Sequence, residues 1–362
     1  MLDPLAMPTV GSGSYLPADV HILLRATELA PTAVLEKERC IQRQQKHYSE
    51  MLSREEAPSG SHLAYFERAL ENSAGRMAAD VQALALGLAA RYTGASIVLV
   101  SFVRAGLPVG VLLRRALLEQ RRDVHHYGIS IVRGRGIDTV ALEHIIARHG
   151  AQNIAFVDGW TGKGAIAAEL KRSLAGDHRF PDLPRLVVLA DPCGRAWLAA
   201  SAQDWLIPSG VLGATVSGLV SRSVWPTDAG LHGCVVQHDL KAHDLTRSFI
   251  ERVDAARATV RASAAAPWAP PHAKALQAAT SGVFGHLCER FDTNDLNRIK
   301  PGIAEATRAV FRRIPDQVVV RDRRDPDVQL LIHLAQQADI EVQEAGTVLG
   351  PYRAVTLIRR VS

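Results

Sequence analysis

The stretch Ile154-Ala-Phe-Val-Asp-Gly-Trp-Thr-Gly-Lys-Gly-Ala-Ile166 decides how this chain is expected to fold. Four apolar residues end in Asp158, and a glycine-rich turn then opens an amphipathic segment that runs to Leu174. This order predicts a buried strand, a tight loop and a helix start. Glycines let backbone N-H groups approach a ligand, and a helix start adds a favourable dipole. The stretch therefore predicts an anion site at the carboxyl end of a strand, where open α/β sheets bind ligands.

The sequence of the turn narrows the kind of anion. A Walker A loop would need a glycine at position 157 and a hydroxyl residue after the lysine, where this chain has Val157 and Gly164. An acid followed by Thr-Gly in a short turn resembles instead the phosphoribosyl-diphosphate loop of type I phosphoribosyltransferases. That resemblance implies that the acid holds ribose hydroxyls and the turn holds the 5'-phosphate. The donor-binding residues implied here are Asp158, Gly159, Thr161, Gly162, Lys163 and Gly164. Those enzymes usually carry two adjacent acids, and Gly159 replaces the second.

Two further strand-to-helix turns precede this loop. An apolar strand at 97–100 leads into Arg104, Ala105 and Gly106 before a helix, and the corresponding turn of phosphoribosyltransferases meets the pyrophosphate. A strand at 126–132 leads into a run that holds Arg133, Arg135 and Asp138, followed by a helix at 139–149. Guanidinium groups suit phosphate oxygens, so we expect this run, like Asp158, to contribute to catalysis.

The strand and helix alternation continues with a strand at 186–190 and a predicted helix at 195–205. Four strands that alternate with helices predict a mostly parallel sheet with helices on both faces, and its three ligand-competent turns at one end. On the amino-terminal side, helical spacing predicts helices at 18–29 and 34–52, and one or two helices at 62–92.

The four cysteines, Cys40, Cys193, Cys234 and Cys288, are far apart and form no CxxC pair. This spacing argues against structural zinc and a disulfide framework and suits a reducing cytosol. Cys193 follows a strand and precedes a predicted helix, so it is a candidate nucleophile with His126, His232 or His238 as base. The alternative is a small core residue.

Length and composition set the frame. With 362 residues the chain exceeds one typical domain, and 47% hydrophobic residues allow a sizeable core. The net charge of +5 allows a polyanionic partner without requiring one. No signal-peptide pattern and no apolar run of the length that spans a bilayer is present, so we expect a soluble, cytoplasmic protein without a membrane partner.

A change of composition at 264–280, rich in alanine and proline, predicts a linker before a last domain at 281–362. There, Lys-Pro-Gly-Ile-x-Glu-Ala-Thr-Arg opens a helix that runs to Arg313 and resembles the Pelota-type RNA-binding domain. The resemblance implies a small α/β/α sandwich that recognises the shape and backbone of structured RNA. The alternative is a merely basic surface. The RNA-binding residues implied are Lys300, Gly302, Glu305, Arg308 and Arg312.

Taken together, the segments 47–51, 101–110, 126–138, 156–166, 191–194 and 206–209 resemble the bacterial StiP family. This resemblance implies a helical extension at 1–60, a phosphoribosyltransferase-like domain at 61–263 and association with tellurite-resistance and stress gene clusters, whose enzymes are then expected partners. The sequence is compatible with a homodimer and does not determine the oligomeric state. The family carries two labels, cysteine protease and phosphoribosyltransferase. The residues favour a transferase that uses phosphoribosyl diphosphate and Mg²⁺, and we assign no direct protein ligand to the metal. A cysteine protease centred on Cys193 and a non-catalytic nucleotide and RNA regulator are the alternatives.

Overall fold

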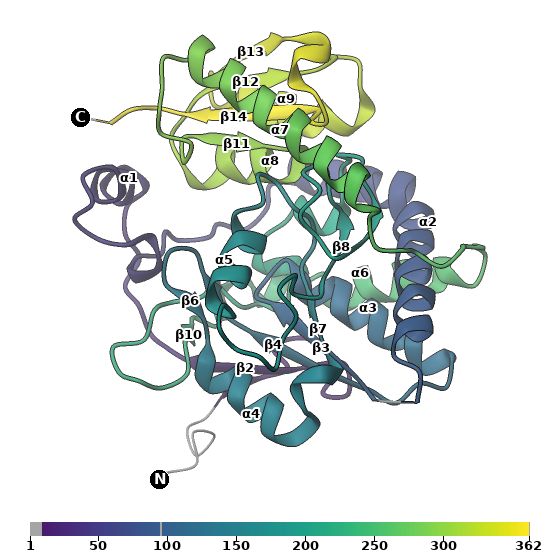
Figure 1. Ribbon diagram of the computed structural model, residues 1–362. Coiled ribbons are helices and arrows are strands. Elements are labelled where there is room, and N and C mark those ends of the chain that lie inside the picture. The colour runs from purple at the N-terminus through teal and green to yellow at the C-terminus, as the bar shows by residue number, and fades with distance from the viewer. Residues whose placement is uncertain (1–8, 95, 362) are drawn as a thin grey trace.

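The computed structural model describes residues 9–94 and 96–361, and it is built around one mostly parallel sheet (Figure 1). The strand order is β1-β2-β4-β3-β7-β8-β9, with β10 beside β2, and only β1 runs antiparallel to its neighbour. The strands are β1 (Thr9–Gly11), β2 (His21–Ala26), β3 (Ile97–Phe102), β4 (Val124–Ile129), β7 (Ile154–Val157), β8 (Leu186–Ala190), β9 (Leu198–Ser201) and β10 (Gly233–Cys234).

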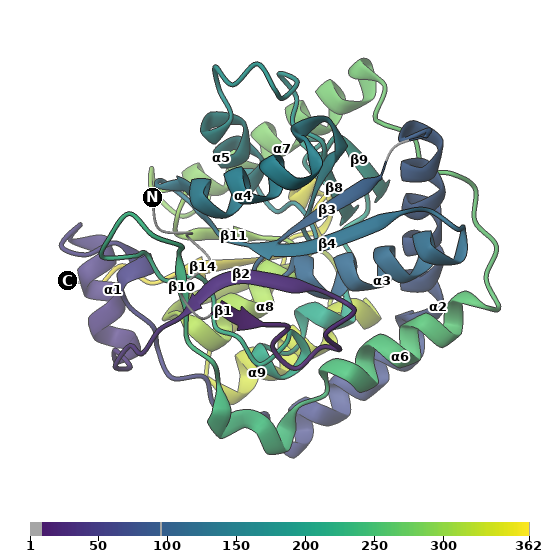
Figure 2. The ribbon, with the colours of Figure 1, turned by 90° about the horizontal axis from the view of Figure 1, so that it is seen from below.

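Helices cover both faces of this sheet (Figure 2). Alternate residues of β3 belong to opposite cores: Leu99 packs with α2 (Gly60–Arg91), α3 (Gly106–Glu119) and α6 (Thr246–Arg257), whereas Val100 packs with residues of the helices on the other face. Those helices are α4 (Thr139–His149) and α5 (Ala165–Ser173). Every residue of β3 is buried, as expected for a central parallel strand. The predicted fold class, a parallel sheet flanked by helices, is confirmed.

The chain reverses direction across the sheet at β3. From β3 it passes to β4 on one side and then to β7 on the other, with Ser101 of β3 paired to Val157 of β7. The carboxyl ends of β3 and β7 therefore flank a topological switch point, the place where ligands bind in open α/β sheets. Between β4 and α4 the chain forms a small hairpin of β5 (Ile131–Val132) and β6 (Gly136–Ile137).

The carboxyl-terminal part forms a separate four-stranded sheet of order β11-β14-β12-β13. Its core on one side involves α7 (Pro270–Arg290), and on the other α8 (Ile303–Arg312) and α9 (Gln329–Gln337), so the predicted α/β/α sandwich is confirmed. The strands are β11 (Ile299–Pro301), β12 (Pro315–Val320), β13 (Glu341–Glu344) and β14 (Ala354–Ile358). Within the described residues, no helix combines the length and the apolar character needed to cross a membrane.

Three predicted elements differ in type from the structure, and a fourth, the helix at 34–52, differs in length. The segment 18–29 is not a helix but contains β2, because Ile22, Leu23 and Leu24 alternate between the two cores of the sheet and are all buried. The predicted helix at 195–205 is instead β9 and a loop. The segment predicted as a linker contains the start of α7, which begins at Pro270. Short apolar runs do not distinguish strand from helix by periodicity, which explains the first two errors.

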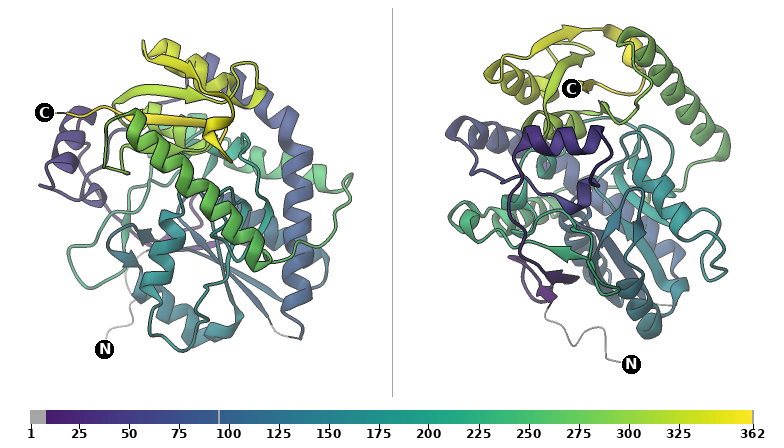
Figure 3. Two further views of the ribbon diagram at one scale, coloured as in Figure 1. Left: turned by 45° about the horizontal axis from the view of Figure 1, so that its top comes forward. Right: turned by 90° about the vertical axis from the view of Figure 1, so that its left-hand side faces the viewer.

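The amino-terminal helix α1 (Val34–Gln42) packs beside the carboxyl-terminal domain (Figure 3). Glu38 accepts hydrogen bonds from Arg313 at 2.5 and 2.7 Å, and the side-chain amide of Gln42 donates to the carbonyl of Arg359. A predicted helix at 34–52 is thus shorter in the structure, and a 3₁₀ turn at Tyr48–Glu50 follows it. The first 60 residues therefore supply two strands of the main sheet, β1 and β2, and a helix that contacts the last domain.

Gly106, the first residue of α3, is the point at which the β3 turn touches the end of β7. A Cβ added there would lie 2.2 Å from the carbonyl oxygen of Val157 and 3.3 Å from Cα of Asp158. We expect Gly106→Ala to destabilise the protein by about 1 to 3 kcal/mol, because the backbone of β7 cannot move aside cheaply. Chemical denaturation would measure this. Gly282→Ala in α7 is the control, because a Cβ at this exposed position meets nothing within 4 Å and its φ is not positive. An unchanged midpoint for Gly106→Ala would refute the packing argument.

Candidate functional site at the strand ends

The turns after β3 and β7 meet at the mouth of a cavity of about 1060 Å³. Ala105 of the first turn and the segment 160–167 of the second line it, together with Asp158. Gly164 has φ +80° and directly precedes α5, so the chain turns there, and the first residues of the helix line the cavity. The predicted order of strand, loop and helix start is confirmed, and anion binding by this turn stays a prediction.

Asp158 stands at the end of β7 and faces this cavity. One carboxylate oxygen accepts the N-H of Gly159 at 2.8 Å. Burial raises the pKa of Asp158 to about 7, although the Gly159 hydrogen bond and the charge of Arg308 act in the opposite direction. A carboxyl group with such a pKa can accept hydrogen bonds or exchange a proton near neutral pH.

Asp191 holds the loop at 158–164 in place through Thr161. Its buried carboxylate accepts the hydroxyl of Thr161 at 2.5 Å, the backbone N-H groups of Arg195 and Ala196, and the indole N-H of Trp268. The Thr161 hydroxyl is thereby already engaged, so its side chain positions the loop. Sequence reasoning identified the Asp191 turn but not this role.

Cys193 lies under the same loop and is 1% exposed. Its sulfur is 3.6 Å from an oxygen of Asp191, and burial together with that negative charge raises the pKa of the thiol to about 12. The thiol is therefore protonated at neutral pH. Of the proposed bases, His126 is bonded to Ser101 and to the carbonyl of Asp19, and His232 to Ser130. These contacts place both imidazoles in other networks.

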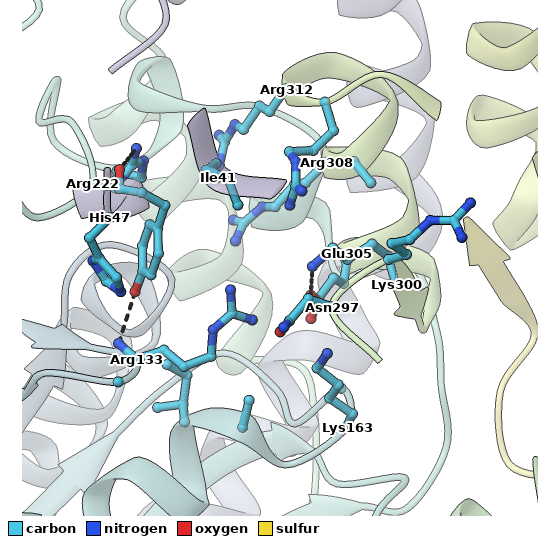
Figure 4. A pocket seen from close by; sticks show the side chains of 18 of the residues that line it. Ile41, His47, Arg133, Lys163, Arg222, Asn297, Lys300, Glu305, Arg308 and Arg312 are labelled. Atoms are coloured by element: carbon cyan, nitrogen blue, oxygen red, sulfur yellow. Dashed lines mark hydrogen bonds and ion pairs between the residues drawn. The ribbon is translucent and has the colours of Figure 1, made fainter. Parts of the chain in front are cut away.

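The two arginine-bearing turns differ in what they offer. Arg104 is buried and held by Glu55 at 2.8 Å, so of this turn Ala105 reaches the cavity lining whereas the guanidinium does not. Arg133, at the tip of the β5–β6 hairpin, lines the cavity, and its guanidinium points into it beside Tyr48 (Figure 4). Arg135 also lines it but is paired with Glu50 at 2.6 Å.

Asp138 has a structural position. One of its oxygens caps α4 by accepting the N-H of Ala141, and the other accepts the N-H of His232 at 2.6 Å. The residue is 1% exposed and is not part of the cavity lining. The structure therefore does not bring Asp138 together with Asp158 and Arg133, and its expected catalytic part has no geometric support.

The residues predicted to bind RNA lie on the opposite wall of the same cavity. Lys300, Glu305, Arg308 and Arg312 all line it. The start of α8, expected to offer free N-H groups, is instead capped by Asp204 of the first domain, whose oxygens accept the N-H of Ile303 at 3.0 and 3.2 Å. Gly302, with φ +86°, forms the turn at this cap. RNA binding by this surface remains a prediction, since the first domain covers it.

Several residues that line the cavity were not predicted from the sequence as part of the site. Arg222 donates to the carbonyls of Tyr48 and Met51, and Trp160 lies under the guanidinium of Arg308, 4.5 Å from it. Lys37 reaches the cavity from α1. These positions come from segments far apart in the sequence, and only the docking of the last domain brings them together.

The cavity is strongly cationic. Its lining holds eleven Lys or Arg side chains against five Asp or Glu. Burial lowers the pKa of Lys300 to about 7 and those of Lys163 and Lys37 to about 8, and neighbouring cations such as Arg133 and Arg222 act in the same direction. Burial and mutual repulsion destabilise the charged forms of these side chains. An anion bound among them would stabilise the charged forms.

This fold and this cavity define an α/β protein with a cationic cavity at the switch point of a parallel sheet, and a second domain forms part of the cavity wall. The chain belongs to the StiP family. Residues 13–254 match the family model described as "Tellurite-like stress resistance cysteine protease StiP", and residues 279–360 match the PELOTA RNA binding domain, so both resemblances seen in the sequence are confirmed.

A relative from Acinetobacter baylyi, named "Cysteine protease StiP", is 49% identical over 363 residues, which cover 97% of this chain and 94% of the relative. That name describes an enzyme. Among solved structures, a mutant hypoxanthine phosphoribosyltransferase from Trypanosoma cruzi in complex with the product IMP matches at 16% identity, over 53% of this chain and 94% of that chain, with a TM-score of 0.28.

Proposed function

We propose that the protein is a phosphoribosyltransferase-like enzyme that uses phosphoribosyl diphosphate and Mg²⁺. The observation that carries the proposal is the meeting of the β3 and β7 turns in one cavity with eleven cationic side chains. A sugar that bears a phosphate at one end and a diphosphate near the other matches this distribution of charge. The last domain forms one wall of the cavity, so its cations face the same space as the turns of the sheet.

In this proposal the residues of the chain act mainly by position and charge. The backbone of 161–165 and Lys163 bind the 5'-phosphate, since free N-H groups at a helix start favour that anion. Asp158 accepts hydrogen bonds from ribose hydroxyls, and its negative charge stabilises the positive character that develops on the sugar as the diphosphate leaves. Arg133 donates to the leaving group.

The residues present are compatible with Mg²⁺ carried by the substrate. Asp158 and Glu305 are acids of the cavity that influence one another electrostatically, while no cluster of three His, Cys, Asp or Glu forms a protein cage among the described residues. Mg²⁺ commonly binds through substrate phosphates, water and one or two carboxylates. When bound, the ion neutralises charge on the diphosphate.

Titration calorimetry with phosphoribosyl diphosphate and Mg²⁺ tests the proposal. We expect saturable binding that takes up about one proton per ligand at pH 8, because Lys300 and Lys163, with pKa values of about 7 and 8, become more fully protonated beside phosphate. Affinity should fall as pH rises from 7 to 9. Titrations in Tris and in HEPES, whose ionisation enthalpies differ, give the number of protons.

Lys300→Gln should reduce this proton uptake, whereas exchange of the exposed Lys171 for Gln should not. Heat that is the same in both buffers would contradict the proposed role of the two lysines. Absence of binding at millimolar ligand would contradict the phosphoribosyl-diphosphate proposal itself. Where binding occurs, release of pyrophosphate on addition of candidate acceptors would separate a transferase from a non-catalytic nucleotide sensor.

A cysteine protease is the second candidate. It is favoured by the name of the family and by the position of Cys193 beside Gly164 of the glycine-rich loop after β7. The buried, protonated thiol weighs against it, because the thiolate is the nucleophile in such enzymes. Cleavage of a casein substrate that is lost in Cys193→Ser would support the protease, and pyrophosphate release retained by the same variant would support the transferase.

A further inference from the structure

The carboxyl-terminal domain supplies almost half of the positive charge of the cavity. Five of the eleven Lys or Arg side chains in the lining come from it, namely Arg298, Lys300, Arg308, Arg312 and Arg313. Arg308 and Arg312 are four residues apart on α8, so they lie on one face of the helix, and both line the cavity. A domain of the RNA-binding type thus directs its basic helix at a site inside this chain.

These arginines are incompletely paired within the protein. The guanidinium of Arg308 rests on the ring of Trp160, at 4.5 Å, but its buried Nε has no hydrogen-bond partner in the part of the chain that the structure describes. Arg312 lies among Arg104, Arg308 and Arg222, with Glu55 as the acid among its electrostatic neighbours. Burial and these like charges lower its pKa, so this end of the cavity favours an added anion.

The two ends of the cavity are separated. Figure 4 shows Arg308 and Arg312 on one side of the cavity and Lys163, from the glycine-rich loop after β7, on the other. Arg308 is an electrostatic neighbour of both Asp158 and Arg104, which places it near the turn after β3. A ligand that spans the cavity would therefore need two separated anionic groups.

The covering of α8 restricts the size of that ligand. Asp204 caps the start of the helix, the hydroxyl of Tyr352 donates to the carbonyl of Gly162, and the ammonium of Lys163 donates to the carbonyl of Leu296. These contacts join the two domains and leave α8 facing the cavity between them. A cavity of about 1060 Å³ admits a small molecule instead.

We propose that Arg308 and Arg312 of the Pelota-type domain form a diphosphate subsite, so that this domain completes the small-molecule site of the first. Two guanidinium groups one helical turn apart can each donate paired hydrogen bonds to one phosphoryl group. The assignment of this diphosphate to a phosphoribosyl donor depends on the proposed function, whereas the subsite itself is tested with inorganic pyrophosphate.

The test compares Arg308→Gln and Arg312→Gln in the full chain by calorimetry with magnesium pyrophosphate, and separately with ribose 5-phosphate. We expect each variant to weaken pyrophosphate binding by about tenfold or more, since a charge-assisted pair is lost, and ribose 5-phosphate binding by less than about threefold. Arg324→Gln is the matched control, because it removes the same charge from an exposed position of the same domain.

Arg308→Lys keeps the charge without the planar group, so it should retain part of the affinity, and it serves as the second variant where Arg308→Gln unfolds. Equal pyrophosphate affinity in the wild type and both glutamine variants would overturn the subsite even where phosphoribosyl diphosphate binds. Dependence on Arg308 without any phosphoribosyl transfer would uphold the subsite and refute the proposed function. Binding of a kinked structured RNA through these arginines, without pyrophosphate binding, would also overturn the proposal.

Discussion

Asp158→Asn is expected to lower phosphoribosyl transfer by on the order of 10²-fold or more, because an amide cannot supply the negative charge that stabilises a cationic sugar. The variant should fold, since the amide oxygen can still accept the N-H of Gly159 and the residue keeps its size. Initial rates of pyrophosphate release under saturating donor would measure the loss. Asp182→Asn, the same exchange on an exposed loop, is the control.

The pH dependence gives an independent test of Asp158. Burial raises its pKa to about 7, so the carboxylate is mostly protonated at pH 6 and mostly ionised at pH 8. If the ionised form is required, the rate should rise through pH 7 and level off above pH 8, and the asparagine variant should lack this rise. A wild-type rate that falls over this range would contradict the assigned role.

The stability of the same variant separates a functional from a structural role. An acid whose pKa is higher in the folded than in the unfolded protein disfavours folding as pH rises through the interval between the two values. Asp158→Asn should therefore be at least as stable as the wild type at pH 8 while it is much less active. Loss of activity accompanied by an equal loss of stability would indicate that Asp158 supports the fold instead.

The sequence was sufficient for the part of the fold that depends on local pattern. The apolar run at 154–157, the acid after it and the glycines that follow predict strand, loop and helix because each local preference agrees with the buried central position. The strand at 21–26 was missed for the opposite reason. Its apolar residues are continuous and its flanks are charged, which fits a short helix as well as an edge-near parallel strand.

The candidate site could be predicted only in its first half. The spacing of Asp158 and the glycines predicts their place in the site, and the position of Arg133 before a helix predicts its place. The second half depends on how the last domain docks, and docking is decided by single contacts such as Asp204 with Ile303. A lone acid in a loop has no pattern that distinguishes a helix cap across a domain boundary from a solvated side chain.

The same limit explains Arg104. Its place between a buried strand and a helix predicts a phosphate ligand. In the structure, however, its guanidinium donates a hydrogen bond at 2.8 Å to Glu55, which lies 49 positions earlier in the chain. A distant acid that satisfies an arginine leaves no trace in the local sequence. Arg308 and Arg312, predicted for RNA, keep their charge available but face a cavity instead of solvent.

Asp204→Ala is expected to release the last domain from the first and to cost about 2 to 4 kcal/mol of stability, since the buried N-H of Ile303 and the half-buried N-H of Arg353 lose their acceptor. The carboxylate accepts the N-H of Ile303 at the start of α8 and the N-H of Arg353 at 2.8 Å before β14. Both donors belong to the carboxyl-terminal domain, whereas Asp204 follows β9 of the main sheet. Thermal unfolding should shift to lower temperature or divide into two transitions.

The loss should extend to ligand binding, because the cap fixes the start of α8 and with it Arg308, which lies five residues further along the same helix. Asp204→Asn keeps one oxygen acceptor and should lose less stability than Asp204→Ala, while Asp182→Ala on an exposed loop should behave as the wild type. Pyrophosphate affinity should fall in the same order as stability. Full affinity in a destabilised Asp204→Ala protein would show that the basic helix reaches the cavity without this cap, and that the domains are held together mainly by contacts such as Glu38 with Arg313.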